Sequence, residues 1–260
     1  MRDITIIIPV HEYNDYVKTL LVRAIQSVPS DYKVHIITPN NLDGELEWVT
    51  DEYKNVVAFC TLNETSDFAT LVNNGVSSCE TTWFSILEFD DEYTNIWFNN
   101  VEKYIEYNPE VSVFLPLEEL IDYNKNQFIG YGNEAPWASS FSNEIGYIDN
   151  DCLQQYFDFY LTGAVFNTED WKAYGGLKSS IKISFWYEFL LRMTSKGKKV
   201  FVIPKLGYKH YVDRENSLYD VYRKTVSEEE SAWYFELAKQ EAHFIQDRNK
   251  TYENKEEEGE

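Results

Sequence analysis

Segments typical of buried strands alternate with segments typical of helices over the first 116 residues, and this order limits the folds open to the chain. The strand-like segments are short apolar runs, as in strands that are buried on both faces. This pattern predicts an α/β domain in which a mainly parallel central sheet is flanked by helices through right-handed crossovers. The strand-like segments are 4–10, 33–38, 55–60, 83–87 and 111–115, and the helix-like ones are 17–28, 66–78 and 94–105.

The rest of the chain is predicted to complete the same domain, which we expect to cover residues 1–248. Residues 117–150 are rich in Asn, Gly, Tyr and Ser without clear periodicity, which indicates a long insertion or an active-site loop. Strand-like and helix-like segments return in residues 151–217. Residues 218–248 are predicted to be helical, and the Glu-rich residues 249–260 to be a disordered tail.

Composition limits the kinds of binding partner and the cellular compartment that we expect for this protein. A formal net charge of −21, from 23 basic and 44 acidic residues, disfavours binding to nucleic acid or to an anionic membrane. Three cysteines without regular spacing argue against a disulfide framework or a zinc site. The apolar run near the N-terminus is too short to span a bilayer and lacks a cleavage site. We therefore expect a cytoplasmic protein with reduced thiols and no membrane span.

A cluster of acids, Glu88, Asp90 and Asp91, directly follows the strand-like segment 83–87. Open α/β sheets bind their ligands beyond the carboxyl ends of the strands. On an extended chain Glu88 and Asp90 project to the same side, and paired carboxylates favour Mg²⁺ or Mn²⁺. The alternatives are a solvated acidic turn and, for Asp91, the cap of the following helix.

Several short motifs lie along the chain in a fixed order. They read I-T-I-I-I-P-V-H-E-Y-N at 4–14, L-V-N-N-G-V at 71–76, L-E-F-D-D at 87–91, T-G-A at 162–164, G-G-L at 175–177 and Y-E-F-L-L-R at 187–192, followed by His210, Arg214 and Ser217. In this order and spacing they resemble family 2 glycosyltransferases of the glycosyltransferase-A fold, over residues 3–215. The resemblance implies a single Rossmann-like domain that transfers a sugar from a nucleotide-sugar to a hydroxyl acceptor, a glycan or another molecule.

The resemblance also implies a divalent cation, Mn²⁺ or Mg²⁺, which binds the leaving diphosphate. Its ligands would be Asp90, Asp91 and His210, although a lone histidine between two tyrosines is also typical of a packed or surface residue. The residues implied on the nucleotide-sugar side are Pro9, Val10, His11, Glu12, Asn14, Asn40, Asn74 and Glu88.

The chain departs from the family at two places. Asn40, after Thr38 and Pro39, stands where the family carries an Asp that holds the nucleotide base. Counted back from Arg192, the family's Glu-Asp pair with the catalytic base falls on residues 185–186, which are Phe and Trp here.

The leading candidate for the missing base is Glu188, with Asp170 behind it; for both, an ordinary helix acid is the alternative. Glu188 borders the predicted apolar face of its helix, where partial desolvation raises the pKa of a carboxyl toward the range of a general base. Because donor and acceptor must meet, we predict that Glu188 reaches the cleft above Asp90.

Two other functions stay open at this point. The replacements at residues 38–39 and 185–186 favour a non-catalytic descendant of the fold, which would serve as a binding or assembly module. A nucleotidyltransferase is the other alternative, and the absence of a phosphate loop of Gly, Arg or Lys near Val10 argues against it.

Overall fold

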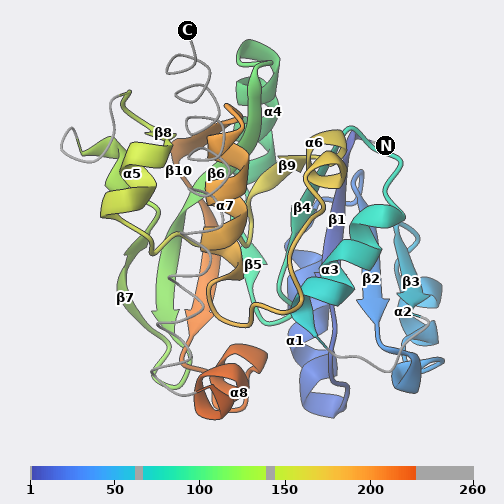
Figure 1. Cartoon of the computed structure of the whole chain (residues 1–260). Helices are drawn as coiled ribbons and strands as arrows, with labels where there is room; N and C mark the ends of the chain where they lie inside the picture. Colours follow the sequence, from blue (N-terminus) through green and yellow to red (C-terminus); the bar gives the residue numbers. More distant parts are fainter. Residues whose placement is uncertain (1, 62–66, 139–143, 227–260) are drawn as a thin grey trace, which may run out of the picture.

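The computed structural model describes residues 2–61, 67–138 and 144–226 (Figure 1). They form one ten-stranded sheet in the order β3-β2-β1-β4-β9-β6-β10-β5, with β7 paired to β6 and β8 paired to β10. Helices cover the sheet, and apolar side chains fill a core cluster on each of its faces: Ile7 of β1 enters one cluster, Ile6 and Ile8 the other. The predicted α/β class is confirmed.

The first half is a run of parallel strands that alternate with helices. Its strands pair in the order β3-β2-β1-β4, all parallel. Gly75 of α3 permits close packing on this sheet, because a Cβ there would lie 2.6 Å from Ile7. The elements are β1 (Ile4–Pro9), α1 (Asp15–Gln26), β2 (Lys33–Thr38), the 3-10 turn η1 (Asn40–Leu42), α2 (Glu47–Glu52), β3 (Val56–Cys60), α3 (Phe68–Ser77) and β4 (Trp83–Ile86).

The second half is mixed in direction. The strand β9 runs antiparallel to both β4 and β6 and so joins the two halves, while β10 runs parallel to β6. The elements are β5 (Glu92–Tyr93), α4 (Trp97–Tyr107), β6 (Val111–Asp122), β7 (Gln127–Gly132), η2 (Ala135–Trp137), β8 (Tyr147–Ile148), α5 (Asn150–Gln155), β9 (Val165–Asn167), α6 (Thr168–Ala173), α7 (Phe185–Ser195), β10 (Lys199–Val212) and α8 (Leu218–Thr225).

The segment 117–150, expected to be an insertion or an active-site loop, begins with regular strand structure. Instead of ending near residue 115, β6 continues to Asp122 and turns back as β7, an antiparallel hairpin partner. The strand was expected to end at Pro116, but this proline lies inside β6, and the buried acids Glu118 and Asp122 follow it. Likewise, the two strand-like segments after residue 199 are one strand, β10, whose register against β6 shifts near Pro204.

Two further predictions concern segments that lie partly or wholly outside the described residues. The helical segment expected over 218–248 begins as α8, which ends at Thr225, and residues 227–248 lie outside the described part. The acidic tail over 249–260 lies outside it as well. Within the described ranges, no helix has both the length and the apolarity needed to cross a bilayer.

Candidate functional site

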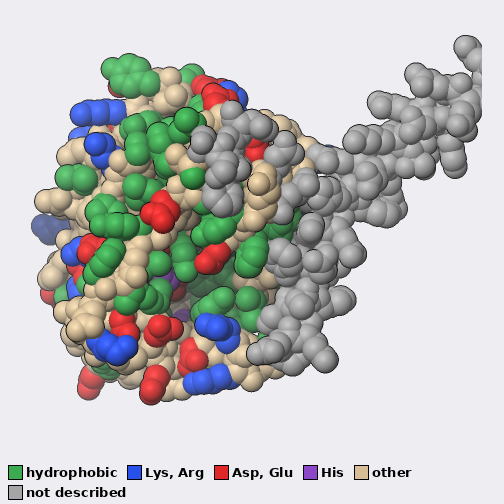
Figure 2. Space-filling view, turned by 90° about the vertical axis from the view of Figure 1, so that its left-hand side faces the viewer, with side chains coloured by type: hydrophobic (Ala, Val, Ile, Leu, Met, Phe, Trp, Pro, Cys, Tyr) green, Lys and Arg blue, Asp and Glu red, His purple; other side chains and the backbone are tan. Residues whose placement is uncertain are grey.

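A cavity of about 1000 Å³ opens beyond the carboxyl ends of β1 and β4, against the last residues of β10. One end is lined by Pro9 and His11, and its floor by the acidic turn after β4. Figure 2 looks onto a hollow ringed by hydrophobic and acidic side chains, with histidine at its bottom. The cavity therefore lies where open α/β sheets bind ligands.

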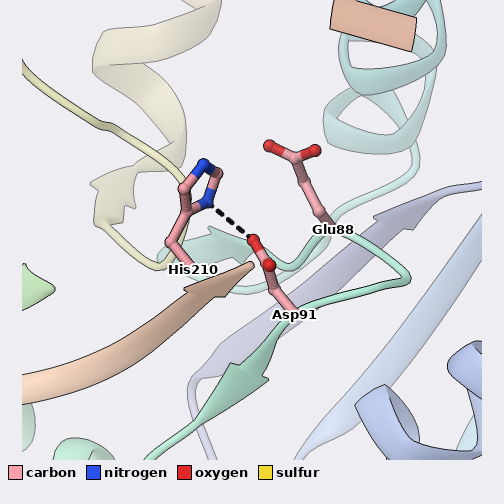
Figure 3. A group of neighbouring side chains, drawn as sticks. All are labelled: Glu88, Asp91 and His210. Carbon is pink, nitrogen blue, oxygen red and sulfur yellow. Dashed lines mark hydrogen bonds and ion pairs between the residues drawn. The ribbon is translucent and has the colours of Figure 1, made fainter. Parts of the chain in front are cut away.

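Three floor residues form a cluster with the composition of a cation site. Ligand atoms of Glu88, Asp91 and His210 all lie within 4.8 Å of one another (Figure 3). Asp91 is fixed from two sides: its Oδ2 lies 2.9 Å from Nδ1 of His210, and its Oδ1 accepts a hydrogen bond of 2.8 Å from the backbone N–H of Tyr211. Two carboxylates and an imidazole suit Mn²⁺ or Mg²⁺, so the residues present fit such a cation.

The T-G-A motif supports this cluster through Tyr208. Gly163 has φ +75°, and a Cβ there would lie 2.4 Å from the Tyr208 ring, so only glycine lets the ring pack at this point. The buried Tyr208 hydroxyl accepts a hydrogen bond of 3.1 Å from the backbone N–H of Glu88. Gly163 of the T-G-A motif thus helps, through Tyr208, to fix the acidic turn.

The charges of the cluster are strongly coupled. Burial raises the pKa of Glu88 to about 8, and the neighbouring Asp91 and Asp90 add to the rise. Burial lowers the pKa of His210, but the carboxylates of Asp91 and Glu118 outweigh it and raise that pKa to about 10. Burial also raises the pKa of Asp91. Without a cation the imidazole is therefore held in its charged form by the surrounding carboxylates.

Asp90, expected to be a cation ligand, has another partner. Its Oδ2 accepts a hydrogen bond of 2.6 Å from Nε of the buried Arg214, whose NH1 lies 3.5 Å from Glu12. The expectation assumed an extended chain, but residues 89–90 form a turn that points Asp90 at Arg214 and leaves Glu88 with Asp91. The predicted set is corrected accordingly, with Glu88 in place of Asp90.

The expectation that Glu188 reaches the cleft is wrong. Glu188 is 1% exposed, is not part of the cavity wall, and accepts hydrogen bonds of 2.6 and 2.7 Å from Arg192. Lys178 lies 3.1 Å from the same carboxylate. Asp170 is also outside the cavity wall, 2.6 Å from Lys198. The pairing of Glu188 with Arg192 follows from their i,i+4 spacing on one helix, whereas the pairings with Lys178 and Lys198 depend on the tertiary fold.

The residues expected on the nucleotide-sugar side divide into two groups. Pro9, His11 and Glu88 line the cavity. The others have structural partners or lie away from the cavity wall: Val10 is fully buried, Glu12 lies near Arg214, Asn14 caps α1 by accepting from Val17 N–H, Asn40 lies in η1, and Asn74 donates to the Thr70 carbonyl.

Sequence reasoning did not identify most of the opposite wall of the cavity. It is largely aromatic and carries one exposed carboxylate, that of Asp158 in the segment before the T-G-A motif. The alternation Y-F-D-F-Y at 156–160 was the available signal, since a lone acid among aromatics is unusual in a loop. The wall includes Phe157, Asp158, Tyr160, Trp186, Tyr187 and Tyr219.

Comparison with solved structures shows the same fold in a bacterial protein. Against the crystal structure of S. aureus TarS 1-349 in complex with UDP-GlcNAc, the TM-score is 0.68 at 12% identity, over 90% of this chain and 65% of that chain. Against the same protein in complex with UDP, the TM-score is 0.61 at 12% identity, over 81% and 60% of the two chains.

At this identity the likeness concerns the fold, and the predicted glycosyltransferase-A fold is confirmed. The chain spans about two thirds or less of the length of these neighbours, at 60–65% for the TarS 1-349 structures. No family model matches the sequence. No curated protein matches it either.

Proposed function

We propose that this protein is a metal-dependent glycosyltransferase that moves a sugar from a nucleotide-sugar donor to a hydroxyl acceptor. The observation that carries the proposal is the cluster of Glu88, Asp91 and His210 at the floor of the cavity. The bound UDP-GlcNAc and UDP of the structural neighbours make a uridine diphosphate sugar the first donor to test. The cytoplasmic location stays a prediction; Cys60, Cys79 and Cys152 are free thiols.

The cation would be held by Glu88, Asp91 and His210. When bound, it supplies Lewis-acid stabilisation of the charge that develops on the leaving diphosphate. Arg214 adds a second positive charge at the cavity wall, at present neutralised by Asp90. The donor would thus lie with its diphosphate over the acidic floor and its nucleotide toward Pro9 and His11.

The acceptor would bind against the aromatic wall of the cavity. Flat rings such as those of Trp186 and Tyr219 offer apolar faces with polar edges, which suits a sugar ring. In the transfer, the bond from the anomeric carbon to the diphosphate oxygen breaks and a bond to the acceptor oxygen forms. The acceptor proton must then go to a base. Glu188 and Asp170 are ion-paired outside the cavity wall, so we assign this role to Asp158.

A binding experiment tests the donor half of the proposal. Isothermal titration calorimetry with UDP and UDP-GlcNAc, each with and without Mn²⁺, should show cation-dependent binding. Asp91→Asn should abolish the dependence on Mn²⁺, while Glu119→Gln, in the adjacent hairpin but outside the cavity wall, should not. Equal binding with and without Mn²⁺ would contradict a metal-dependent donor site.

A non-catalytic binding module is the second candidate. It is favoured by the residues at 185–186, where Phe185 and Trp186 stand in place of the expected acids, and by the engagement of Glu188 with Arg192. Donor turnover separates the two candidates. Slow release of UDP from UDP-GlcNAc, accelerated by sugar acceptors, supports the enzyme, whereas Mn²⁺-dependent donor binding without any turnover supports the binding module.

A further inference from the structure

Glu118 is a buried carboxylate to which the proposed function gives no role. It lies in the middle of β6, between Tyr208 of β10 and Gly132 of β7. Its exposed fraction is 0%, and neither carboxylate oxygen has a hydrogen-bond partner among the described residues. A buried carboxylate without donors is costly, because it has lost water and gained nothing in exchange.

Three other buried acids have hydrogen-bond partners. Asp90 is bound by Arg214, Asp91 by His210 and the Tyr211 N–H, and Glu188 by Arg192. Glu118 has no hydrogen-bonded partner among the described residues, and the basic group that acts on it electrostatically is His210. Its carboxylate therefore depends on His210, and on any cation bound beside it, for compensation.

The register of the sheet places Glu118 next to the cation cluster. Glu118 is directly opposite Tyr208, and His210 follows two residues later on the same face of β10. A long side chain on one strand reaches such a diagonal neighbour on the next. The carboxylate accordingly interacts electrostatically with His210, Asp91 and Glu88, although it is not part of the cavity wall and so does not meet the substrate.

We infer that Glu118 is a positioning residue of the cation centre, a buried acid that acts through His210 to hold the imidazole for the cation. The inference rests on the proposed function, because it requires a cation at Glu88, Asp91 and His210. Carboxylates behind a ligating histidine raise its basicity. Glu118 would do so through space, because its oxygens make no hydrogen bond within the described residues and Nδ1 of His210 pairs with Asp91. Burial raises the pKa of Glu118 well above its ordinary value, and a dication nearby would favour its ionised form.

The test compares Glu118→Gln with Glu119→Gln. The first removes the charge and keeps the shape, and the second makes the same change on the adjacent residue, whose side chain points to the opposite face. Mn²⁺ binding is measured on the full chain without donor, by electron paramagnetic resonance of free Mn²⁺. We expect about a tenfold weaker affinity for Glu118→Gln and an unchanged affinity for Glu119→Gln.

Two further measurements separate positioning from a structural role. The ¹⁵N resonances of the His210 ring, followed during titration with Mg²⁺, should differ from wild type in Glu118→Gln and match it in Glu119→Gln. The melting temperature without cation should not fall in Glu118→Gln, since the substitution keeps the shape of a side chain that has no hydrogen-bond partner among the described residues. Glu118→Asp, which restores the charge, should recover part of the Mn²⁺ affinity.

Wild-type Mn²⁺ affinity in Glu118→Gln would overturn the inference and leave the proposed function standing. Failure of both Glu118→Gln and Glu118→Asp to fold would overturn it too, because the residue would then be structural. A wild-type protein that binds no Mn²⁺ would overturn the cation site itself, and with it the role of Glu118.

Discussion

The Nδ1 atom of His210 lies 2.9 Å from Oδ2 of Asp91, although 119 positions separate the two residues in the chain. One comes from the end of β10 and the other from the turn after β4, and Glu88 completes the group (Figure 3). The contact therefore depends on the assembly of both halves of the sheet. A change that loosens either half is expected to act on the cation site.

His210→Gln should lower Mn²⁺ affinity without unfolding the protein, because glutamine keeps a polar group near Asp91 but gives up the imidazole ligand. We expect a loss of at least about tenfold, as for removal of a metal-supporting group. Calorimetric titration with Mn²⁺ measures it. His35→Gln, in a histidine that pairs with Ser78 outside the cavity, is the control. Unchanged binding in His210→Gln would remove this residue from the ligand set.

Mn²⁺ affinity should rise with pH. The pKa of His210 is raised to about 10 and that of Glu88 to about 8 in the unliganded protein. Cation binding needs both groups deprotonated, so protons compete with the cation until the pH exceeds these values. Titrations at several pH values between about 6 and 9 measure the slope, which should flatten in His210→Gln. An Mn²⁺ affinity that does not change with pH would contradict the competition between protons and the cation.

The same shifts make the protein without cation less stable as pH rises. Both pKa values are higher in the folded protein than their ordinary values of 6.5 and 4.5. The stabilisation from each is therefore complete below its unfolded pKa and is lost as pH rises through its folded pKa. Urea unfolding should show a decline between about pH 6.5 and 10 that Mn²⁺ reduces. A stability that increases with pH over this range would contradict the raised pKa values of His210 and Glu88.

Asp158→Asn should abolish sugar transfer and leave Mn²⁺-dependent binding of UDP intact, since the amide keeps the shape but takes no proton. Asp213→Asn, in the other exposed acid of the cavity wall outside the acidic turn, is the matched control and should retain transfer. Donor turnover measures sugar transfer, and calorimetry measures the Mn²⁺-dependent binding of UDP. Loss of transfer in Asp213→Asn with full activity in Asp158→Asn would move the base to Asp213.

Glu188→Gln should reduce stability, not donor binding. It leaves the guanidinium of Arg192 without its buried counter-charge, and removal of one partner of a buried ion pair costs about 3 kcal/mol or more. Urea unfolding measures this loss, and Glu169→Gln on the exposed side of α6 is the control. Full stability with lost transfer would instead return Glu188 to the role of catalytic base.

The sequence was sufficient for the first half of the fold. Apolar runs such as that of β1 and β4 are unambiguous because both faces of these strands are buried. It was insufficient for β6, where buried acids such as Glu118 break the apolar pattern, and for residue 204, where a proline lies inside β10. Local pattern cannot show that a polar residue is enclosed by strands distant in sequence.

The sequence indicated which residues form the site, whereas the tertiary structure determines which of their side chains interact with one another. The acids after β4 and the histidine near the end of β10 were identified from motif order as one ligand set, but the pairing of Asp90 with Arg214 was not. The turn at residues 89–90 directs Asp90 to Arg214 and leaves Glu88 to the cluster. Glu188 was assigned from helical spacing, yet Arg192 and Lys178 hold it in the core. Charges act through space, so only the folded chain decides which carboxylates are neutralised and which remain to bind a cation.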